Sequence, residues 1–564
     1  MIASARRMKA VGTALAASGL GLCVARPPTA RADELSGADK LRALYSAEFR
    51  FTREGLPVVP VSVAEGLRGL TVSAEGGLRV LPEGEGGPEI RADGEWQVSM
   101  KDGKPARIRY WTVVWRGGPT EAAAAADEVK AWKARGAGAR AFEQGTLFGV
   151  AGEVLDRREI LVAVGPVKTM DEAEKASDSL AKMTKTAKLA ATGVYTELAE
   201  RPSGYIEAVG AHTATRIRNE GVIWFAPVGD APVRIQGLLP AAGGAAAKDA
   251  GRSYFGKIYV TIDRNGALAV VNAVPEDRLL AGLVPAEIFP SAPDEALKAQ
   301  AVAARGELLA KIGTRHLADP YRLCSTTHCQ VYSGAGKEMP RTTAAVKATQ
   351  GEVLFTADAR DLADTVYSAN CGGHTENNEN VWPDMHANAL LRGRSDAASP
   401  AGGGTMVGKD GVTAANLAAF IDAPPDAWCR RAKLGAGDRY RWTARLAAAD
   451  LARMVAPLGV GAVRAIEVVE RGVSGRARAL RIVGTKKTET VRRELRIRQT
   501  FGGLRSSLFL VDMAADGSAT FRGAGFGHGV GLCQTGAVGM AEAGKSYQEI
   551  LRHYYTGSVL RKLW

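Results

Sequence analysis

The carboxyl group of Glu287 has neighbours that would let it donate a proton. Val284, Ile288 and Phe289 flank it, and a helical pattern follows at residues 294–308 with its apolar positions on one face. Apolar surroundings remove hydration from a carboxyl group and favour its protonated form. A general acid for cleavage of a glycosidic bond needs that form near neutral pH. The same residue types also fit an ordinary solvated glutamate in a loop.

Cysteine and histidine gather between residues 316 and 329. Cys324 and the adjacent pair His328-Cys329 offer soft ligands for Zn²⁺, and His316 could supply a further one. The spacing matches no zinc-finger pattern, so a disulfide between Cys324 and Cys329 is a competing interpretation for an exported chain. Both alternatives stay open.

A polar motif suited to sugars spans residues 371–377 and reads Cys-Gly-Gly-His-Thr-Glu-Asn. Its two glycines would let the backbone approach a substrate closely. His374, Glu376 and Asn377 offer hydrogen-bonding groups, and Trp382 offers a face for stacking on a sugar ring. A tight turn at the end of a strand, with Trp382 in the core, is the alternative.

Glycine occupies every second position around His528, from Gly523 to Gly531. Each glycine weakens a strand, so an ordinary strand does not explain this run. We expect backbone wrapped tightly beneath a cleft. A phosphate-binding loop is the rival interpretation, although the run lacks the Gly-Lys-Ser/Thr ending of such loops.

The elements ahead of these motifs are mostly strands. Residues 44–104 alternate short β-type runs with turn signals, which is typical of antiparallel sheet. Residues 257–262 and 268–271 predict a hairpin around Asn265-Gly266, because the glycine supplies the positive φ of a tight turn.

Residues 107–183 contain a strand–helix unit twice. Strand patterns at 110–115 and 160–164 are each followed by Gly-Pro and then by a helical pattern. We expect each helix to pack its apolar face on the preceding strand, giving a small βαβα-type module. The apolar positions share one spacing: Ala122, Ala125, Val129 and Trp132 in the first helix, and Ala173, Ala176, Leu180 and Met183 in the second.

The first residues have the pattern of an export signal. A basic segment ending at Lys9 precedes an apolar stretch at residues 10–25, and Ala30-Arg31-Ala32 offers a small-x-small cleavage site. We expect a signal peptide at residues 1–32 and an exported protein, periplasmic or associated with the cell wall. The apolar stretch is shorter than a permanent transmembrane helix requires, so membrane attachment is not expected.

The net charge and the cysteine content limit which binding partners and which thiol states are expected. The 564-residue chain has a formal net charge of +13, but its basic residues are scattered and no nucleic-acid motif accompanies them. A polyanionic wall or membrane face therefore fits better than nucleic acid, and a merely solvated basic surface is an equal alternative. Cys23 would leave with the signal peptide, and the five cysteines that remain are an odd number. At least one thiol is therefore free, metal-bound or intermolecular.

Four blocks of the chain resemble, in the correct order, the stage II sporulation protein D family. They lie at residues 272–305, 324–354, 367–383 and 523–537, and the glycine run around His528 is the most diagnostic of them. The resemblance covers about residues 205–564. It implies a lytic transglycosylase, which cleaves the bond between N-acetylmuramic acid and N-acetylglucosamine in peptide-stripped peptidoglycan strands and leaves 1,6-anhydro ends.

The resemblance also implies roles for particular residues. Glu287 would act as general acid and then as general base, and the reaction would require no cofactor. The groups expected to orient the sugar are His374, Glu376, Asn377, His528 and Gln534. Because some family members hold zinc, the resemblance implies a structural zinc site at His316, Cys324 and Cys329.

Four positions depart from the family pattern. Ile288 stands where Met is usual, Gly306 where Thr is common, and Cys533 and Thr535 where Ser and Tyr are frequent. These departures keep an alternative open. Relatives described as amidase enhancers bind the wall without established catalysis, and the partner of such a protein would be a wall amidase.

The segment Val162-Ala163-Val164-Gly165-Pro166 and the helix after it resemble a SPOR-type domain, a family that binds peptide-stripped glycan; any small packing module is the alternative. Overall the sequence predicts an α+β fold with mostly antiparallel β-rich N-terminal parts, the βαβα-type module, and a mixed α+β catalytic domain. The expected divisions are 1–32 (signal peptide), 33–104 (β-rich segment), 105–185 (SPOR-like module) and 205–564 (catalytic domain). Whether the β-rich segment joins the catalytic domain, with the module inserted, stays open.

Overall fold

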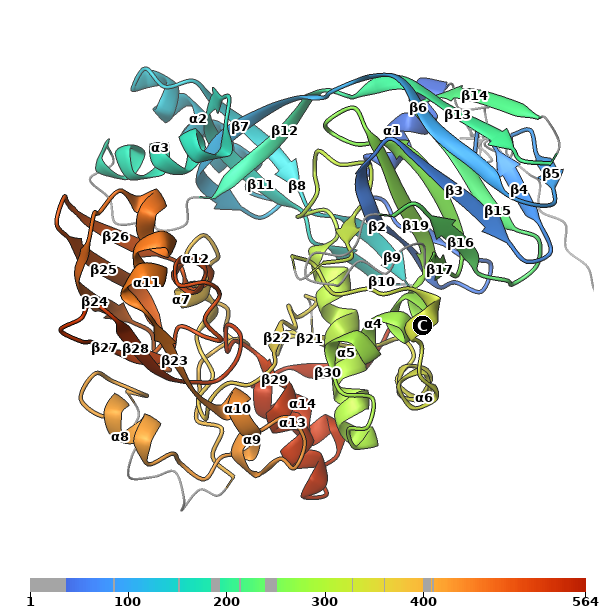
Figure 1. Cartoon of the computed structure of the whole chain (residues 1–564). Helices are drawn as coiled ribbons and strands as arrows, with labels where there is room; N and C mark the ends of the chain where they lie inside the picture. The colour runs from blue at the N-terminus through green and yellow to red at the C-terminus, as the bar shows by residue number, and fades with distance from the viewer. Residues whose placement is uncertain are drawn as a thin grey trace, which may run out of the picture.

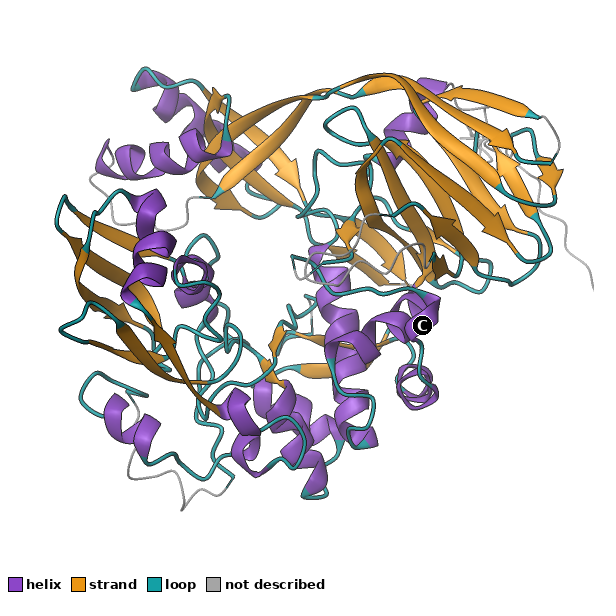
Figure 2. Ribbon diagram, in the orientation of Figure 1, coloured by secondary structure: helices purple, strands orange, loops and turns teal. Residues whose placement is uncertain are grey.

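The computed structural model describes residues 37–84, 87–150, 153–183, 193–212, 215–238, 251–326, 328–359, 361–398, 407 and 410–564. The signal peptide expected at residues 1–32 lies outside these ranges. The described chain is mixed α+β with many antiparallel strands, as predicted (Figures 1 and 2). None of its described helices combines the length and the apolar character that a bilayer crossing requires.

Two sheets form the β-rich part at the upper right of Figure 1. The first has the order β1-β2-β19-β18-β15-β4-β5, with β20 parallel to β2, and the second has the order β14-β13-β6-β3-β16-β17. Apolar side chains from both sheets belong to one core, as expected for a sandwich. The strands of the first sheet are β1 (Arg50–Phe51), β2 (Pro57–Leu67), β4 (Leu78–Leu81), β5 (Ile90–Ala92), β15 (Val222–Pro227), β18 (Lys257–Ile262), β19 (Leu268–Pro275) and β20 (Leu323–Cys324). Those of the second are β3 (Gly69–Ala74), β6 (Trp96–Lys104), β13 (Ser203–Gly210), β14 (Arg216–Glu220), β16 (Val233–Gln236) and β17 (Arg252–Tyr254).

Strands from either side of the small module pair with each other. In the first sheet β2 pairs with β19, and in the second β6 pairs with β13. The β-rich segment before residue 105 and the strands after residue 202 therefore build the same two sheets. The module enters after β6 and leaves before β13, which are hydrogen-bonded neighbours, so it is an insertion into this sandwich. The predicted hairpin is present as β18 and β19, with Gly266 at φ 81° in its turn.

The inserted module has two more strands than the expected βαβα unit. Its elements run strand–helix–strand–strand–helix–strand, and its antiparallel sheet has the order β12-β7-β11-β8. This is the ferredoxin-like arrangement. The expected helix faces are largely correct: Ala125, Trp132, Ala173 and Leu180 are buried and Val129 and Ala176 half-buried, whereas Ala122 is exposed. The elements are β7 (Arg107–Gly117), α2 (Ala122–Ala134), β8 (Ala139–Gln144), β11 (Glu159–Val167), α3 (Met170–Met183) and β12 (Val194–Glu200).

A hairpin within the module reaches the main core. Strands β9 (Leu147–Val150) and β10 (Glu153–Asp156) lie between β8 and β11 in the chain. Phe148 and Leu155 of this hairpin are buried in the core that the sandwich and the central helices share. The module is therefore anchored by side chains as well as by its two connections.

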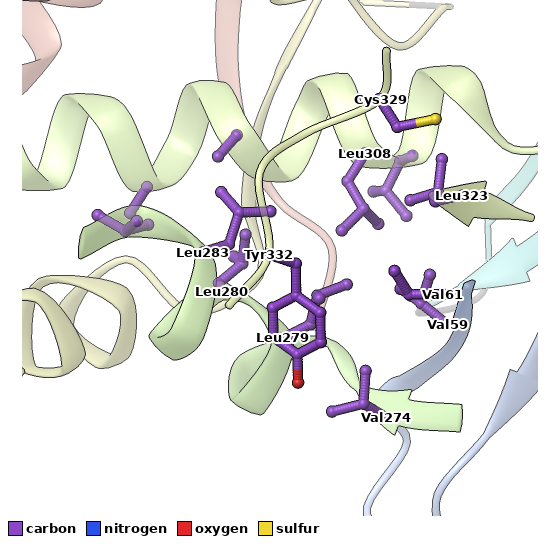
Figure 3. Close-up of a cluster of buried hydrophobic side chains, with 14 of the residues drawn as sticks. Val59, Val61, Val274, Leu279, Leu280, Leu283, Leu308, Leu323, Cys329 and Tyr332 are labelled. Atoms are coloured by element: carbon purple, nitrogen blue, oxygen red, sulfur yellow. The ribbon is translucent and has the colours of Figure 1, made fainter. Parts of the chain in front are cut away.

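Helices pack beside the sandwich around α5 (Asp294–Lys311). We expected one apolar face on this helix, but it is buried from Ala296 to Lys311 except at Lys298, because alanine lets neighbours approach on all sides. Its neighbours are α4 (Glu276–Glu287), α6 (Pro340–Ala348), α13 (Gln534–Glu542) and α14 (Tyr547–Tyr554). Figure 3 shows the apolar cluster joining these helices to the sandwich, labelled Val59, Val61, Val274, Leu279, Leu280, Leu283, Leu308, Leu323, Cys329 and Tyr332.

A buried ion pair locks α4 to α5. The guanidinium Nε of Arg305 donates to Glu276 Oε1 at 2.6 Å, and neither side chain is exposed. Arg305 also donates to the carbonyl groups of Thr349 and Glu352. Removing one partner of such a pair is strongly destabilising, so the first turn of α4 is held firmly against α5.

The C-terminal lobe carries its own apolar core. Its two three-stranded sheets have the orders β23-β28-β27 and β24-β25-β26. The chain returns from this lobe through two short pairings, β22 (Tyr367–Ser368) with β29 (Leu532–Cys533) and β21 (Glu352–Phe355) with β30 (Val559–Lys562). The lobe's elements are β23 (Arg441–Leu446), α11 (Ala448–Val455), β24 (Val463–Arg471), β25 (Ala477–Gly484), β26 (Thr488–Arg492), α12 (Glu494–Thr500), β27 (Phe509–Met513) and β28 (Ala519–Ala524). Further short helices are α1 (Gly37–Leu44), α7 (Asn378–Val381), α8 (Leu417–Asp422), α9 (Trp428–Arg431) and α10 (Gly437–Tyr440).

Candidate active site

Glu287 is the last residue of α4, where the sequence suggested a turn. Its carboxylate Oε1 accepts a hydrogen bond from the Val331 N–H at 2.8 Å. Burial, with a smaller contribution from the charge of Glu307, raises the pKa of Glu287 to about 7. The Val331 N–H, Lys311 and Tyr367 act in the opposite direction. Near neutral pH a large fraction of this carboxyl group is therefore protonated.

A small depression opens beside Glu287. It is lined by Glu287, Ile288, Phe289, Leu434, Arg439, Gln534, Thr535 and Val538. Glu287 is the carboxyl group among these residues, and Arg439 is the cation. The Arg439 guanidinium lies 4.6 Å from the centre of the Phe289 ring, and within the described residues it has no ion-pair partner. The depression therefore combines one proton donor, one positive charge and apolar walls.

Gln534 is the one predicted sugar-orienting residue that lies in this depression. Its Nε2 donates to the backbone carbonyl of Glu287 at 2.9 Å and to Gln300 Oε1 at 3.2 Å. The N-terminus of α13 is thereby fixed against the end of α4. This contact joins residues 247 positions apart, and it places the glycine-rich segment next to the acid.

His528 contacts Tyr367, which in turn lies within hydrogen-bonding reach of Glu287. Its Nδ1 accepts from the Val530 N–H at 3.1 Å, and its ring also bonds to the backbone of Tyr367. Burial, together with Arg476, lowers the pKa of His528 to about 3, so the ring is neutral. Both ring nitrogens are engaged, and the ring faces Trp382 at 4.9 Å between centroids. The structure places His528 where it positions Tyr367, rather than in the depression.

Tyr367 and Gln330 belong to the site although we did not select them from the sequence. The Tyr367 hydroxyl donates to Gln330 Oε1 at 3.0 Å and lies within hydrogen-bonding reach of the Glu287 carboxyl group. Gln330 is held in turn by the carbonyl of Ala304. The signal available in the sequence was that Tyr367 opens the block containing the Gly-Gly-His motif and that Gln330 follows the Cys/His segment.

Glu376 binds its own protein instead of facing a cleft. It is 1% exposed, and its two carboxylate oxygens accept five hydrogen bonds. The donors are Asn377 N, Asn380 Nδ2, Val473 N, Ser474 N and Ser474 Oγ, at 2.6–3.1 Å. Glu376 therefore ties the loop after β22 to the β24–β25 turn, in place of the sugar contact expected from the sequence.

The other two members of this motif are also directed inward. His374 is 4% exposed and its Nδ1 donates to the Thr375 carbonyl at 2.7 Å; burial lowers the pKa of His374, which favours the neutral ring. Asn377 begins α7, and its Oδ1 accepts from the Gly393 N–H at 2.7 Å. Neither lines the depression at Glu287, and their role in sugar binding stays a prediction.

The residues implied as zinc ligands lie together. His316, Cys324, His328 and Cys329 each offer one ligand atom, and these atoms lie within 4.8 Å of one another. His316 Nε2 is 3.3 Å from Cys329 Sγ, and His328 Nδ1 is 3.6 Å from both sulfurs. Both thiols are free. His328 thus joins the three ligands implied by the resemblance.

The surroundings of this cluster fit a metal. His316 Nδ1 bonds to Asp319 Oδ2 at 2.9 Å, which directs Nε2 toward the sulfurs, and the carboxylate is itself held by Arg264. Such a carboxylate behind a histidine is typical of zinc sites. A zinc ion here would act structurally, by holding residues 316–329 in place. The buried Lys311 donates to the carbonyl of Cys329 at 2.8 Å and contacts Glu307, which links this cluster to the acid.

One poorly hydrated carboxyl group beside a cation, in an α+β frame, defines a candidate acid–base site. Known protein families match the part of the chain that carries this site. A family model described as stage II sporulation protein matches residues 264–355, which hold α4, α5 and the acid, and a model for a domain of unknown function matches residues 377–531.

Three relatives each match about half of this chain. An uncharacterized protein of Brachyspira hyodysenteriae is 31% identical over 309 residues, covering 54% of this chain and 72% of the relative. The amidase enhancer of Bacillus subtilis is 28% identical over 50% of this chain and 40% of its own length. Stage II sporulation protein D of Bacillus amyloliquefaciens is 26% identical over 51% of this chain and 74% of its own length. The chain belongs to the stage II sporulation protein D and amidase enhancer family, as its sequence motifs indicated.

Proposed function

We propose that the protein is an exported, cell-wall enzyme that cleaves peptidoglycan strands as a lytic transglycosylase, with Glu287 as general acid and general base. The observation that carries the proposal is the pKa of about 7 at a carboxyl group lining a depression. That value suits a group that must first give a proton and then take one.

The geometry supports a mechanism with one carboxyl group. Protonated Glu287 would donate its proton to the glycosidic oxygen as the bond from that oxygen to C1 of the muramyl unit breaks. The resulting carboxylate would take the proton of the muramyl 6-hydroxyl as that oxygen bonds to C1. No water is consumed, and Glu287 ends protonated again. A hydrolase would instead use two carboxyl groups flanking the bond, whereas Glu307 is 7% exposed and contacts Lys311.

Two further residues suit this substrate class. Gln534 holds the backbone of Glu287 and reaches the depression, so it would position the acid. Arg439 lies in the same depression. A guanidinium there suits the lactyl carboxylate that peptide removal leaves on muramic acid. We include the inserted module in the proposal as an accessory that binds glycan, on the strength of its resemblance to SPOR-type domains.

A non-catalytic enhancer of a wall amidase is the second candidate. The likeness to a protein named amidase enhancer favours it. So does the small size of the depression, because a glycan chain needs several sugar contacts and only Gln534 of the expected contacts lies there.

Product analysis separates the two candidates. The mature protein is incubated with peptide-stripped glycan strands, and the products are identified by mass spectrometry. The enzyme yields 1,6-anhydromuramyl ends, which are one water lighter than hydrolytic ends. Intact strands that nevertheless co-sediment with the protein would overturn the enzymatic proposal and support the enhancer.

A further inference from the structure

A second cluster of soft ligands lies outside the site described so far. Cys371, Asp396, Cys429 and Cys533 each offer one ligand atom, and these atoms lie within 4.8 Å of one another. All four residues are 0% exposed. They come from four separate segments: the loop after β22, the segment after Arg394, helix α9, and the residue before α13. The cluster could not be predicted from sequence patterns, because its members extend from residue 371 to residue 533 without a regular spacing.

The three sulfurs are arranged for coordination rather than for one disulfide. Cys371 Sγ and Cys429 Sγ are 3.7 Å apart, and all three thiols are free. Cys533 Sγ accepts hydrogen bonds from the backbone N–H of Cys371 at 3.1 Å and from that of Gly536 at 3.3 Å. Backbone donors at the start of a nine-residue helix favour the thiolate form, which is the form that binds metals. A disulfide would use two of these sulfurs and leave the third beside a buried acid.

The carboxylate of Asp396 is buried beside the three sulfurs and is held in place by hydrogen bonds. Tyr554 OH donates to Oδ1 at 2.7 Å, and the Cys429 N–H donates to Oδ2 at 3.0 Å. Within the described residues its nearest basic group is the His553 ring at 3.4 Å, and no lysine or arginine pairs with it. A bound metal ion would use this carboxylate as a ligand together with the three sulfurs. The hydrogen bonds to Asp396 also resemble the outer partners that orient metal ligands.

We propose that Cys371, Asp396, Cys429 and Cys533 form a second, structural zinc site. Three thiolates and one carboxylate make a closed set of four protein ligands, and soft sulfur ligands select zinc over magnesium or calcium. Binding converts the thiols to thiolates and releases their protons. The proposal does not depend on the enzymatic function, and it accounts for all five cysteines of the described chain as ligands of two metal ions.

The proposed zinc site would stabilise the segments that hold Glu287 in place. Cys533 immediately precedes Gln534, which bonds to the backbone of Glu287, and Cys371 immediately precedes the Gly372-Gly373 turn. Zinc would therefore connect the loop after β22, helix α9 and helix α13 at the base of the depression.

The test counts zinc ions in the full-length mature protein by elemental analysis and native mass spectrometry. The wild type is expected to hold two zinc ions per chain. The double variant His316→Ala/Cys324→Ser, which disables the other cluster, is expected to keep one. Cys429→Ser, with the other cluster intact, is also expected to hold one. A folded double variant without zinc would overturn the proposal.

Two measurements keep the test decisive if a variant misfolds. X-ray absorption at the zinc edge of wild type should show an average of two and a half sulfur ligands per ion, from three sulfurs at one site and two at the other. Mass spectrometry of the unreduced, denatured wild type should show five alkylatable thiols after chelation. A Cys371–Cys429 disulfide, or an average below two sulfurs per zinc, would contradict the proposal.

Discussion

Glu287 and Glu376 are two carboxyl groups in family motifs with opposite surroundings. Glu287 receives one backbone hydrogen bond, and burial raises its pKa to about 7. Glu376 is more deeply buried but accepts five hydrogen bonds, all from its own protein. Burial alone therefore does not make a carboxyl group reactive. A buried carboxyl group can transfer protons when few hydrogen-bond donors offset its loss of hydration. It has a structural role when donors occupy both of its oxygens.

The largest expected effect is the loss of activity when Glu287 is replaced. Glu287→Gln should reduce release of anhydromuramyl ends by roughly 10³-fold, because the amide cannot donate and reclaim a proton. Its glycan binding, measured by co-sedimentation, should stay unchanged. Glu338→Gln is the matched control, since Glu338 lies outside the depression, and it should retain activity. Full activity of Glu287→Gln would remove Glu287 from its role.

The stability of the protein should depend more on Glu376 than on Glu287. Glu376→Gln should lower the free energy of unfolding by about 3 kcal/mol, because an amide leaves several of the five donors without an acceptor. Glu287→Gln should not destabilise the protein at pH 8. Denaturant unfolding followed by circular dichroism measures both. A Glu376→Gln protein as stable as wild type would show that the hydrogen-bonded loop does not depend on this carboxylate.

The pH dependence of stability sharpens the comparison. The pKa of Glu287 is about 7 in the folded protein against an ordinary 4.5, so between these values the folded state binds more protons than the unfolded state. Glu287 therefore lowers the free energy of unfolding as the pH rises through this window, by about 2 kcal/mol once partial exposure is allowed for. Unfolding of wild type and Glu287→Gln at pH 4.5 and pH 8 should differ by that amount. Parallel pH profiles for the two proteins would contradict it.

Arg439 tests the contribution of charge to binding. Arg439→Gln should raise KM for peptide-stripped glycan about tenfold, equivalent to ~1.4 kcal/mol, with kcat nearly unchanged. Strands that keep their peptides lack the free lactyl carboxylate and should show a smaller change. Arg453→Gln, which alters an exposed pair with Asp450, is the control. An equal loss with both substrates would assign Arg439 to packing on Phe289.

Tyr367 should have the smallest effect. Its hydroxyl lowers the pKa of Glu287, so Tyr367→Phe should raise that pKa. We expect the activity of wild type to fall above about pH 7 as Glu287 loses its proton, and the decline of the variant to move upward by less than about one pH unit. A downward movement, measured as kcat/KM against pH, would show that the hydroxyl acts on Glu287 in another way.

Patterns carried by neighbouring residues could be predicted from the sequence. The hairpin around Gly266 and the buried faces of α2 and α3 follow from local turn chemistry and helical spacing. Helix α4 was missed because Gly282 and Pro285 are typical of a turn, yet Pro285 lies inside the last turn of this helix. The edge strands β8 and β12 were missed because their half-exposed side chains give little periodic signal.

The site itself was predictable only in part. Glu287 and the ligands at residues 316–329 lie within short segments, and apolar neighbours or soft donors mark them. The surroundings of Glu376 come from residues 97 and 98 positions away, in a turn that carries no signal of its own. The same holds for Tyr367 and for the cluster of Cys371, Cys429 and Cys533. The types of these residues were informative. The partners that decide their roles are distant in the chain and are brought to them only by the fold.

The protonation state of Glu287 is the central claim, and it can be measured without assuming any activity. The protein is labelled with ¹³C at its glutamate side-chain carboxyl carbons, and NMR spectra are recorded as the pH is raised, for wild type and for Glu287→Gln. The signal that disappears in the variant should titrate near pH 7. A midpoint near 4.5 would mean that water and neighbouring donors already stabilise the charged form, and the account of Glu287 as a proton donor would fail.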